Sequence, residues 1–303
     1  EEQELLDIKN DYVFKRTFGY KGDEEVTKVL LRDILGMKVN EIDLDVNPIT
    51  EKELMDDKLG IMDIASVVND NVQVDIEMQV VNKNNIEKRI MYYWNAYYQK
   101  SISKGDDYGE LKRTIIILIA DFEIKGIEQA KKYFTEWEIR EKDYSELILT
   151  DVLKICIIEL PKYIKYKVNN PNLNLWTEFL ENPEVINMSE KDIENEKDES
   201  LKTTKKAIKQ AKDTLEQISK DKHEQELARL RKKYIMDQNA IQEYGYCQGV
   251  EDGKRDGIEI GKNNGIQFEK IETAKKMLSK KMPIDVIIEI TGLSKEEIEN
   301  IKN

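Results

Sequence analysis

Alternating apolar and polar residues mark the stretch from 61 to 81 as two strands joined by a tight turn. Two runs rich in β-branched residues flank the segment Asn69-Asp70-Asn71, which is typical of a β-hairpin. Side chains along a strand point alternately to opposite faces, so the second run has one apolar face and one polar face. The polar face carries Gln73, Asp75, Glu77 and Gln79.

The length of the turn decides which side chains face each other. A three-residue turn pairs Val68 with Val72 and places Asp63 opposite Glu77, with Cβ atoms about 4.5–5.5 Å apart. A two-residue turn would place Ile64 opposite Glu77 and send the two acids to opposite faces. We favour the longer turn, because asparagine tolerates the left-handed backbone that it requires.

Two facing carboxylates on rigid strands either share a proton or share a cation. At neutral pH a divalent metal such as Mg²⁺, held by one or two carboxylates and by phosphate oxygens of a substrate, satisfies such a pair. The same pattern also fits an acidic sheet face that is merely exposed to solvent. From the residues alone both interpretations stay open.

Periodicity elsewhere predicts an α/β arrangement, a mixed sheet flanked by helices. Val13, Phe14 and Phe18 fit a first helix, with Asn10 or Asp11 as its N-cap. The other predicted helices cover about 26–35, 86–104 and 173–180, and the other predicted strands cover 39–46, 113–122, 134–139 and 147–160. The strand at 113–122 is continuously apolar, so we expect it at the centre of the sheet with both faces covered.

The C-terminal third has the pattern of an all-helical extension. Residues 183–199 read as a polar linker, and residues 200–270 as a long exposed helix or coiled coil. Within it a glycine recurs every four residues: Gly245, Gly249, Gly253, Gly257, Gly261 and Gly265. Six glycines cost a helix about 5 kcal/mol relative to alanine, and close approach of a second helix would offset that cost. Symmetric self-association is therefore predicted, with a partly disordered tail as the alternative.

The last segment, residues 271–303, predicts three short helices. Pro283 begins one, Gly292 breaks it, and Ser294 with Glu297 forms a capping box for the last. This shape is that of a helix-turn-helix, although charges in the segment nearly cancel. A small packing or docking module is the alternative to DNA reading.

Composition narrows the possible chemistry. The chain has 303 residues, a net charge of −13, two cysteines and a single histidine, His223, in a charged run. One histidine disfavours Ser-His or Cys-His catalysis and a His-rich zinc site, so carboxylates, Lys, Arg or Tyr must carry any chemistry. No apolar run is long enough to span a bilayer, and two isolated cysteines suit a reducing cytosol.

The most basic patch of this acidic chain lies on the helix after the hairpin. Lys88, Arg89, Lys100 and nearby lysines accompany several aromatic residues there, a combination that can neutralise phosphates and stack bases. We interpret most of the aromatic face as core. Lys88, Arg89 and Tyr92 remain the candidates for DNA contact.

Several segments together resemble one protein family. NDYVFKRTFG, the hairpin with DIEMQ, KRIMYYWNAYY, IIELPKY, the glycine repeat and the terminal AKKMLSKKMPIDVIIEITGLSKEEI look like the recombination-promoting nuclease/putative transposase family of the PD-(D/E)XK nuclease superfamily. The resemblance covers essentially the whole chain. It implies a PD-(D/E)XK nuclease domain over residues 1–182, with a mixed sheet and the helical C-terminal extension described above.

The resemblance also implies roles for individual residues. Asp63 matches the motif aspartate and Glu77 the glutamate of the E-x-K element, so these two residues would hold Mg²⁺ or Mn²⁺. Gln79 stands where that element usually has lysine; it can hydrogen-bond the attacking water but carries no positive charge. Lys58 or Arg89 would then supply the cation. Asp11, near a helix start, would be an accessory acid.

The activity implied is metal-dependent DNA cleavage by a bacterial cytoplasmic protein linked to recombination or mobile elements. DNA is the expected partner, together with further copies of the chain in a homodimer or higher homo-oligomer bound through the C-terminal helices. The alternative is a non-catalytic, oligomeric DNA-binding or scaffolding protein that retains a nuclease fold.

Overall fold

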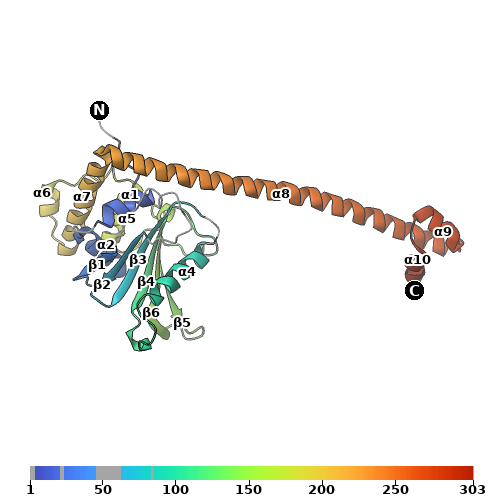
Figure 1. The fold of residues 1–303 in the computed structure, drawn as a ribbon, viewed down its shortest axis with the longest axis horizontal. Coiled ribbons are helices and arrows are strands. Elements are labelled where there is room, and N and C mark those ends of the chain that lie inside the picture. The colour runs from blue at the N-terminus through green and yellow to red at the C-terminus, as the bar shows by residue number, and fades with distance from the viewer. Residues whose placement is uncertain (1–3, 21–23, 46–62, 83–84, 303) are drawn as a thin grey trace. The chain divides into compact units, whose positions relative to one another are not determined.

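The computed structural model describes residues 4–20, 24–45, 63–82 and 85–302 (Figure 1). Within them, six strands form one sheet in the order β1-β2-β3-β4-β6-β5. The strands are β1 (Ile42–Asp45), β2 (Ile64–Val68), β3 (Val72–Gln79), β4 (Arg113–Ala120), β5 (Phe134–Arg140) and β6 (Ile148–Glu159). β1, β2 and β3 pair antiparallel, β3, β4 and β6 run parallel, and β5 is antiparallel to β6. The predicted mixed sheet is confirmed.

Helices precede, interrupt and follow these strands. The α-helices are α1 (Asp11–Phe18), α2 (Glu25–Leu35), α4 (Ile86–Gln99), α5 (Pro171–Glu181), α6 (Glu190–Glu194), α7 (Glu199–Lys220), α8 (Lys222–Ser279), α9 (Ile284–Thr291) and α10 (Lys295–Lys302). Short 3₁₀ turns occupy η2 (Tyr108–Glu110) and η3 (Leu160–Lys162). Asn10 is the N-cap of α1, and Gly36 ends α2 in a left-handed conformation with φ of 63°. The helix predicted over 86–104 is shorter than expected, because α4 ends at Gln99.

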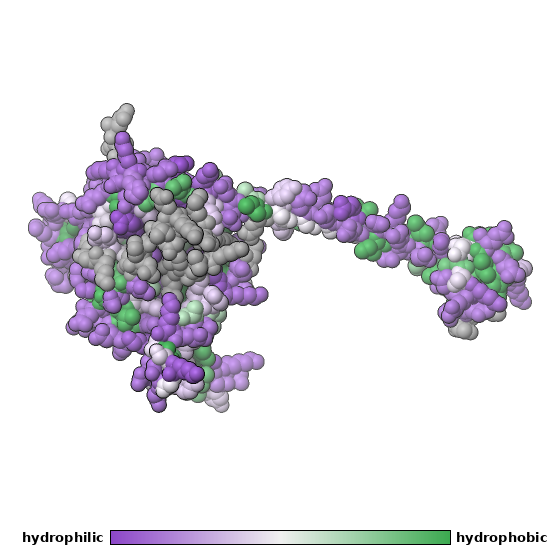
Figure 2. Space-filling view, viewed as in Figure 1, coloured by the Kyte–Doolittle hydropathy of each residue, from purple (hydrophilic) through white to green (hydrophobic). Residues whose placement is uncertain are grey.

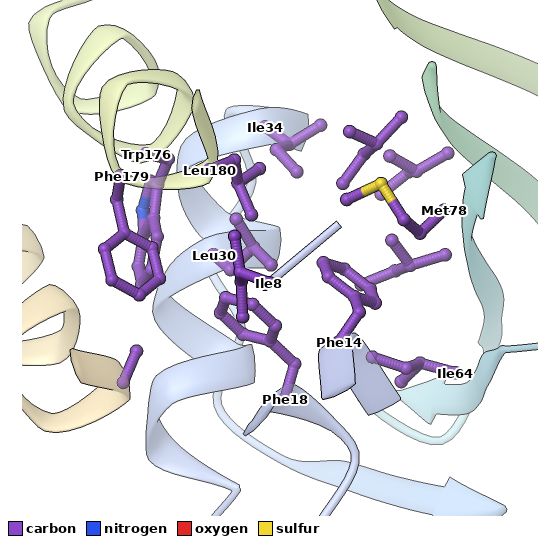
Figure 3. Packing of buried hydrophobic residues seen from close by; sticks show 14 of the residues in the cluster. Ile8, Phe14, Phe18, Leu30, Ile34, Ile64, Met78, Trp176, Phe179 and Leu180 are labelled. Carbon is purple, nitrogen blue, oxygen red and sulfur yellow. The ribbon is translucent and has the colours of Figure 1, made fainter. Parts of the chain in front are cut away.

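Two apolar layers sandwich the sheet. On one face, α1, α2, α5 and α7 build the main core, and Phe14 of α1 lies beside Ile64 and Met78 of the hairpin (Figure 3). On the other face, α4 packs Ile86 and Ile90 over the sheet. The central strand β4 supplies alternate side chains to both layers, so the expectation of a strand covered on both faces is confirmed.

A buried carboxylate joins three of the helices on the first face. Asp33 of α2 accepts hydrogen bonds from Trp176 Nε1 of α5 at 2.9 Å and from Thr204 Oγ1 of α7 at 2.7 Å. Alongside it, α7 buries a stripe of apolar residues in the main core, comprising Ala207, Ile208, Ala211 and Leu215. Residues 199–220 therefore form a helix that packs against the core beside the sheet, whereas the sequence predicted an exposed helix there.

The chain divides into two compact units, one ending at Tyr234 and the other beginning at Ile235. This division differs from the boundary expected near residue 182, and the segment expected as a linker contains α6, with Ile186 and Ile193 buried. The second unit comprises most of α8 with α9 and α10. Residues 271–279 continue α8 without a break and do not form a separate helix.

The C-terminal end of the second unit has a small core of its own. Ala274 and Met277 of α8, Ile287 of α9 and Ile298 of α10 are buried together, with Leu293 between the last two helices. Gly292 ends α9 with φ of 66°, and the predicted capping box is present: Glu297 N donates to Ser294 Oγ, and Ser294 N donates to Glu297 Oε2. Across the described residues, no helix is both long and apolar enough to cross a membrane.

Candidate active site

The hairpin adopts the register that the longer turn requires. Val68 pairs with Val72 and Ile64 with Ile76, so Asp63, directly before β2, continues the ladder opposite Glu77. Asn69 and Asp70 both have positive φ, at 49° and 62°. These are the left-handed conformations expected of a three-residue turn rich in Asn and Asp.

Asp63 and Glu77 meet at the end of this ladder. Asp63 Oδ2 accepts a hydrogen bond from Met78 N at 2.8 Å, and Glu77 Oε1 lies 3.4 Å from Asp63 N, which donates to it. Gln79 Nε2 in turn donates to Glu77 Oε2 at 3.2 Å. The structure therefore brings together the three residues that the sequence singled out on this hairpin.

The polar face of β3 is not a solvated surface, because α4 covers it. Gln73, Asp75 and Glu77 are all at most 5% exposed. Tyr97 of α4 donates its hydroxyl to the carbonyl of Ser66 on β2, which fixes the helix across the strands. The interpretation of this face as merely exposed and acidic is thereby excluded.

A third carboxylate, Asp75, lies on the same face and was assigned no role from the sequence. It is fully buried, and within the described residues neither of its oxygens has a hydrogen-bond partner. Gln73, two residues earlier, is satisfied by the hydroxyl of Thr114 at 3.0 Å. The alternation of β3 predicts that Asp75 lies on the same face as Glu77. Only the structure shows that Asp75 is buried beneath α4 without a hydrogen-bond partner.

Negative charge in this cluster is poorly compensated. Burial is the largest cause that raises the pKa of each of the three carboxyl groups well above its ordinary value. The charge of Glu77 adds to this effect on the pKa of Asp63, the charge of Asp63 on that of Asp75, and the charge of Asp75 on that of Glu77. Perturbed pKa values of this kind concentrate at functional sites.

The donor set fits a hard divalent cation. Oxygen ligands with uncompensated charge are those that Mg²⁺ and Mn²⁺ prefer, and Mg²⁺ usually keeps several waters beside one or two protein carboxylates. Among the described residues, no three acid, histidine or cysteine side chains form a ready-made cage. Asp63 and Glu77 would supply the two protein carboxylates that Mg²⁺ commonly takes beside waters and substrate oxygens.

Arg89 is the basic residue of α4 that faces the acids. Its charge lowers the pKa of Glu77, against the larger opposing effects of burial and of Asp75. Its Nε donates to the hydroxyl of Tyr93 at 2.8 Å, and its guanidinium lies 5.2 Å from the centre of that ring. Burial, with a smaller contribution from Glu77, raises the pKa of Tyr93 to about 12, so this hydroxyl stays protonated near neutral pH.

Other predicted residues lie apart from the cluster or outside the described chain. Lys88 and Tyr92 are exposed on α4, whereas Lys58 is outside the described residues. Asp11 is held by Arg231 of α8, whose Nη2 lies 2.5 Å from Oδ2 of Asp11. The charge of Asp11 nevertheless raises the pKa of Asp63, as a smaller cause than burial and the charge of Glu77. His223 is exposed, as expected.

The glycine repeat lies on α8 in the second unit. A Cβ atom added at any of its six positions would meet no atom within 4 Å, apart from the chain neighbours and the backbone of the helix itself. Apolar side chains on the same stretch are exposed, including Tyr244, Tyr246, Ile258, Ile260 and Phe268.

A mixed sheet with buried acids at the end of its antiparallel hairpin defines the α/β class of restriction-endonuclease-like folds. Comparison with protein families agrees: residues 8–245 match the PD-(D/E)XK nuclease family transposase model, and residues 267–303 match the C-terminal HTH domain of the Rpn/YhgA-like nuclease family. The chain therefore belongs to the PD-(D/E)XK nuclease family of transposases. No curated protein and no solved structure matches it.

Proposed function

We propose that this protein is a metal-dependent DNA endonuclease that hydrolyses phosphodiester bonds. The main support is that Asp63 and Glu77 lie opposite each other in the register of the hairpin, with Glu77 buried. The chain also belongs to a nuclease family. We place its activity in the bacterial cytoplasm, in recombination or in the movement of mobile elements.

The roles of the residues follow from their positions. Asp63 and Glu77 would hold Mg²⁺ or Mn²⁺, and such an ion lowers the pKa of bound water and offsets charge on the phosphate. Gln79, whose amide already reaches Glu77, would hydrogen-bond and orient the attacking water. Asp11 would be at most an accessory acid, because Arg231 donates hydrogen bonds to both of its oxygens.

DNA contact is proposed for two parts of the chain. Lys88, Arg89 and Tyr92 belong to α4, which covers the acids, and Tyr92 is 67% exposed and free to stack on a base. The HTH domain matched at residues 267–303 would provide a second contact.

Substitution of each acid tests the assignment. We expect Asp63→Ala or Glu77→Ala to reduce cleavage of plasmid DNA in Mg²⁺ at least about 10³-fold, because either change removes a ligand for the metal. Asp70→Asn, at the exposed turn of the same hairpin, removes a carboxylate but suits the left-handed backbone, so it is the matched control and should cleave normally. Full activity of either acid variant in folded form would overturn the proposal.

Gln79 favours one alternative, a DNA-binding scaffold that has lost catalysis. Glutamine cannot supply the positive charge that the E-x-K lysine supplies. Calorimetry with Mn²⁺ and a plasmid-nicking assay separate the two functions. A nuclease binds the ion and nicks the plasmid, whereas a scaffold shows neither.

Self-association through α8 is the second part of the proposal. Positions two residues after each glycine, on the opposite side of the helix, are Cys247, Glu251, Arg255, Glu259, Asn263 and Gln267, all exposed. The positions that flank the glycines include Tyr246, Val250, Ile258 and Ile266, and Figure 2 shows apolar side chains interspersed along α8. Asp252, Lys254, Asp256 and Lys262 also flank glycines, so the surface beside them is mixed. Glycines interspersed with apolar side chains suit close packing against a second copy of the helix.

The sign of a glycine substitution tests this packing. If α8 is a lone helix, the double variant Gly253→Ala/Gly257→Ala stabilises it by about 2 kcal/mol, because each alanine contributes about 1 kcal/mol. If the glycines face a partner helix, the added methyl groups weaken the dimer. We expect the second result, read as dissociation by light scattering. An unchanged oligomer with a more stable helix would refute packing through the glycines.

A further inference from the structure

Positive and negative charges are separated along the C-terminal helices. Residues 267–303 carry seven lysines and seven acids, so their formal charges cancel. Five of the lysines and only one acid, Glu272, lie between 270 and 281, in the last turns of α8 and directly after it. Five of the acids and only two lysines lie between 284 and 302, on α9 and α10. The end of α8 is therefore basic, whereas α9 and α10 are acidic.

The charge of α10 opposes the usual docking of a helix-turn-helix on DNA. That docking places the N-terminal residues of the second helix in the major groove, between the two phosphate backbones. Glu296, Glu297 and Glu299 of α10 are exposed, and Lys295 is the basic residue at its start. Glu297 Oε2 also accepts a hydrogen bond from Ser294 N, so this carboxylate caps the helix. Repulsion between the carboxylates and the phosphates disfavours insertion of α10 into the groove.

Four exposed lysines form a basic surface at the other side of this small core. They are Lys275, Lys276, Lys280 and Lys281, which we call the basic helix end. Ala274 and Met277 of α8 are buried with α9 and α10, and a helix turns by about 100° per residue, so Lys275 and Lys276 point away from the acidic helices. Lys275 pairs with Glu272 at 2.9 Å, and within the described chain the other three lysines form no ion pair. Most of this positive charge is therefore available to a ligand.

The last lysine of the basic helix end has an unusual backbone conformation. Lys281 has φ of 59°, and Met282 N donates to the carbonyl of Met277 at 3.2 Å, as in a Schellman helix end. Glycine is the usual residue there, because a Cβ atom crowds the left-handed backbone. Gly36 and Gly292 occupy the corresponding positions after α2 and α9. A lysine where glycine would be more stable indicates a use for its charge.

We propose that the HTH domain contacts duplex DNA through the basic helix end and not through α10. Each lysine is a point charge on a flexible stem, which suits contact with phosphate oxygens of the DNA backbone. Such contacts carry no sequence information, so this surface holds DNA without reading its bases. This inference rests on the DNA contact proposed above for the domain, and it names the residues and the part of the DNA that meet.

The salt dependence of DNA binding by the full chain tests this surface. Fluorescence anisotropy in metal-free buffer measures binding without cleavage, and each phosphate contact contributes about 0.9 to the slope of log affinity against log salt concentration. We expect Lys275→Gln/Lys276→Gln/Lys280→Gln to reduce that slope by about 2–3 and the affinity at about 0.1 M salt by about 30-fold. Two duplexes of unrelated sequence should lose affinity equally. Glutamine forms a helix as readily as lysine does, so α8 should stay intact.

A matched control removes three charges from the other end of the same helix. Lys222→Gln/Lys232→Gln/Lys233→Gln changes the net charge equally, and we expect it to keep most of the affinity and of the slope. Equal losses in the two triple variants would overturn the inference, because net charge alone would then explain them. If α10 enters the groove, Lys295→Gln weakens binding more than the first triple variant does, and that result would overturn the inference as well.

Lys281→Gly separates DNA binding from folding. Glycine suits the left-handed conformation, so this variant should unfold at an equal or higher urea concentration than the natural protein. We nevertheless expect it to bind DNA about three- to fivefold more weakly, because one phosphate contact is lost. Unchanged DNA binding by an equally or more stable variant would contradict the proposed use of this lysine.

The basic helix end and the nuclease function can fail separately. A natural protein that cleaves plasmid DNA, with a first triple variant that binds DNA normally, refutes only the basic helix end. A natural protein that binds DNA through these lysines but does not cleave it in Mg²⁺ refutes only the nuclease function. If the natural protein does not bind duplex DNA in metal-free buffer, the basic helix end has no role in DNA contact.

Discussion

Two buried carboxylates in the same unit have opposite surroundings. Asp33 is 5% exposed and accepts hydrogen bonds from Trp176, Thr204 and the guanidinium of Arg32, with Nη2 of Arg32 only 2.6 Å away. Asp75 is fully buried, and no described residue donates a hydrogen bond to it. The first is a structural junction of α2, α5 and α7, whereas the second lies within the candidate active site.

The difference shows how a fold distinguishes structural charge from functional charge. A buried carboxylate surrounded by donors stabilises the elements it joins, because every lone pair is satisfied. A buried carboxylate without donors costs stability and is retained only where a ligand can compensate it. Asp75 belongs to the second kind, and it lies beside Asp63 and Glu77, whose few hydrogen-bond donors carry no charge, which supports a cation as the ligand.

Removal of Asp33 should have the largest effect on stability. Asp33→Ala leaves the indole N–H of Trp176, the hydroxyl of Thr204 and the charge of Arg32 without their shared acceptor. We expect the free energy of unfolding to fall by about 3–5 kcal/mol, measured by urea denaturation. Asp70→Asn in the hairpin turn keeps a side chain that tolerates the left-handed backbone there and should change it by less than about 0.5 kcal/mol. A small loss of stability in Asp33→Ala would contradict the proposed difference between Asp33 and Asp75.

Asp75→Asn should act in the opposite direction. Asparagine keeps the shape of the side chain and removes a buried charge that has no partner. We expect the metal-free protein to gain about 1–3 kcal/mol of stability at pH 8, measured by the same denaturation. A loss comparable to that of Asp33→Ala would show that Asp75 has a structural partner.

The stability of the metal-free protein should also depend on pH through these acids. Because their pKa values are raised in the folded state, the folded protein binds more protons than the unfolded chain above about pH 4. Their contribution is therefore fully present below the unfolded pKa and is lost as pH rises through the folded values. The gain from Asp75→Asn should consequently shrink between pH 8 and pH 5. If the stability gained by Asp75→Asn does not vary with pH, it does not arise from titration of Asp63, Asp75 and Glu77.

The sequence predicted the hairpin well because its signals are local. Strand alternation and the Asn69-Asp70-Asn71 turn determine the register, which places Asp63 opposite Glu77. The burial of Asp75 depends on how α4 packs across the sheet, which the local pattern of the hairpin does not determine. The packing of α7 was missed for the same reason: its charged sequence resembles an exposed helix, and only Asp33 and the core show which face is covered.

Glu224, at the start of α8, is a third acid for this comparison, and its removal should lower stability less than removal of Asp33. Its carboxylate accepts hydrogen bonds from Tyr12 Oη at 2.7 Å and from Arg16 Nη2 at 2.9 Å, so it is satisfied like Asp33. The Arg16 side chain is 35% exposed, however, and water can replace part of what is lost. We expect Glu224→Ala to cost about 1 kcal/mol, well below the effect of Asp33→Ala.

Salt separates the two contributions at Glu224. The ion pair with Arg16 is screened at high ionic strength, whereas the hydrogen bond to Tyr12 is affected less. Urea denaturation of the natural protein and of Glu224→Ala at about 0.1 and 1 M salt should therefore show a smaller difference at high salt. The contrary outcome is that Glu224→Ala lowers the free energy of unfolding as much as Asp33→Ala does, at both salt concentrations. In that case the number of hydrogen-bond donors matters more than burial for the stability that a hydrogen-bonded acid contributes.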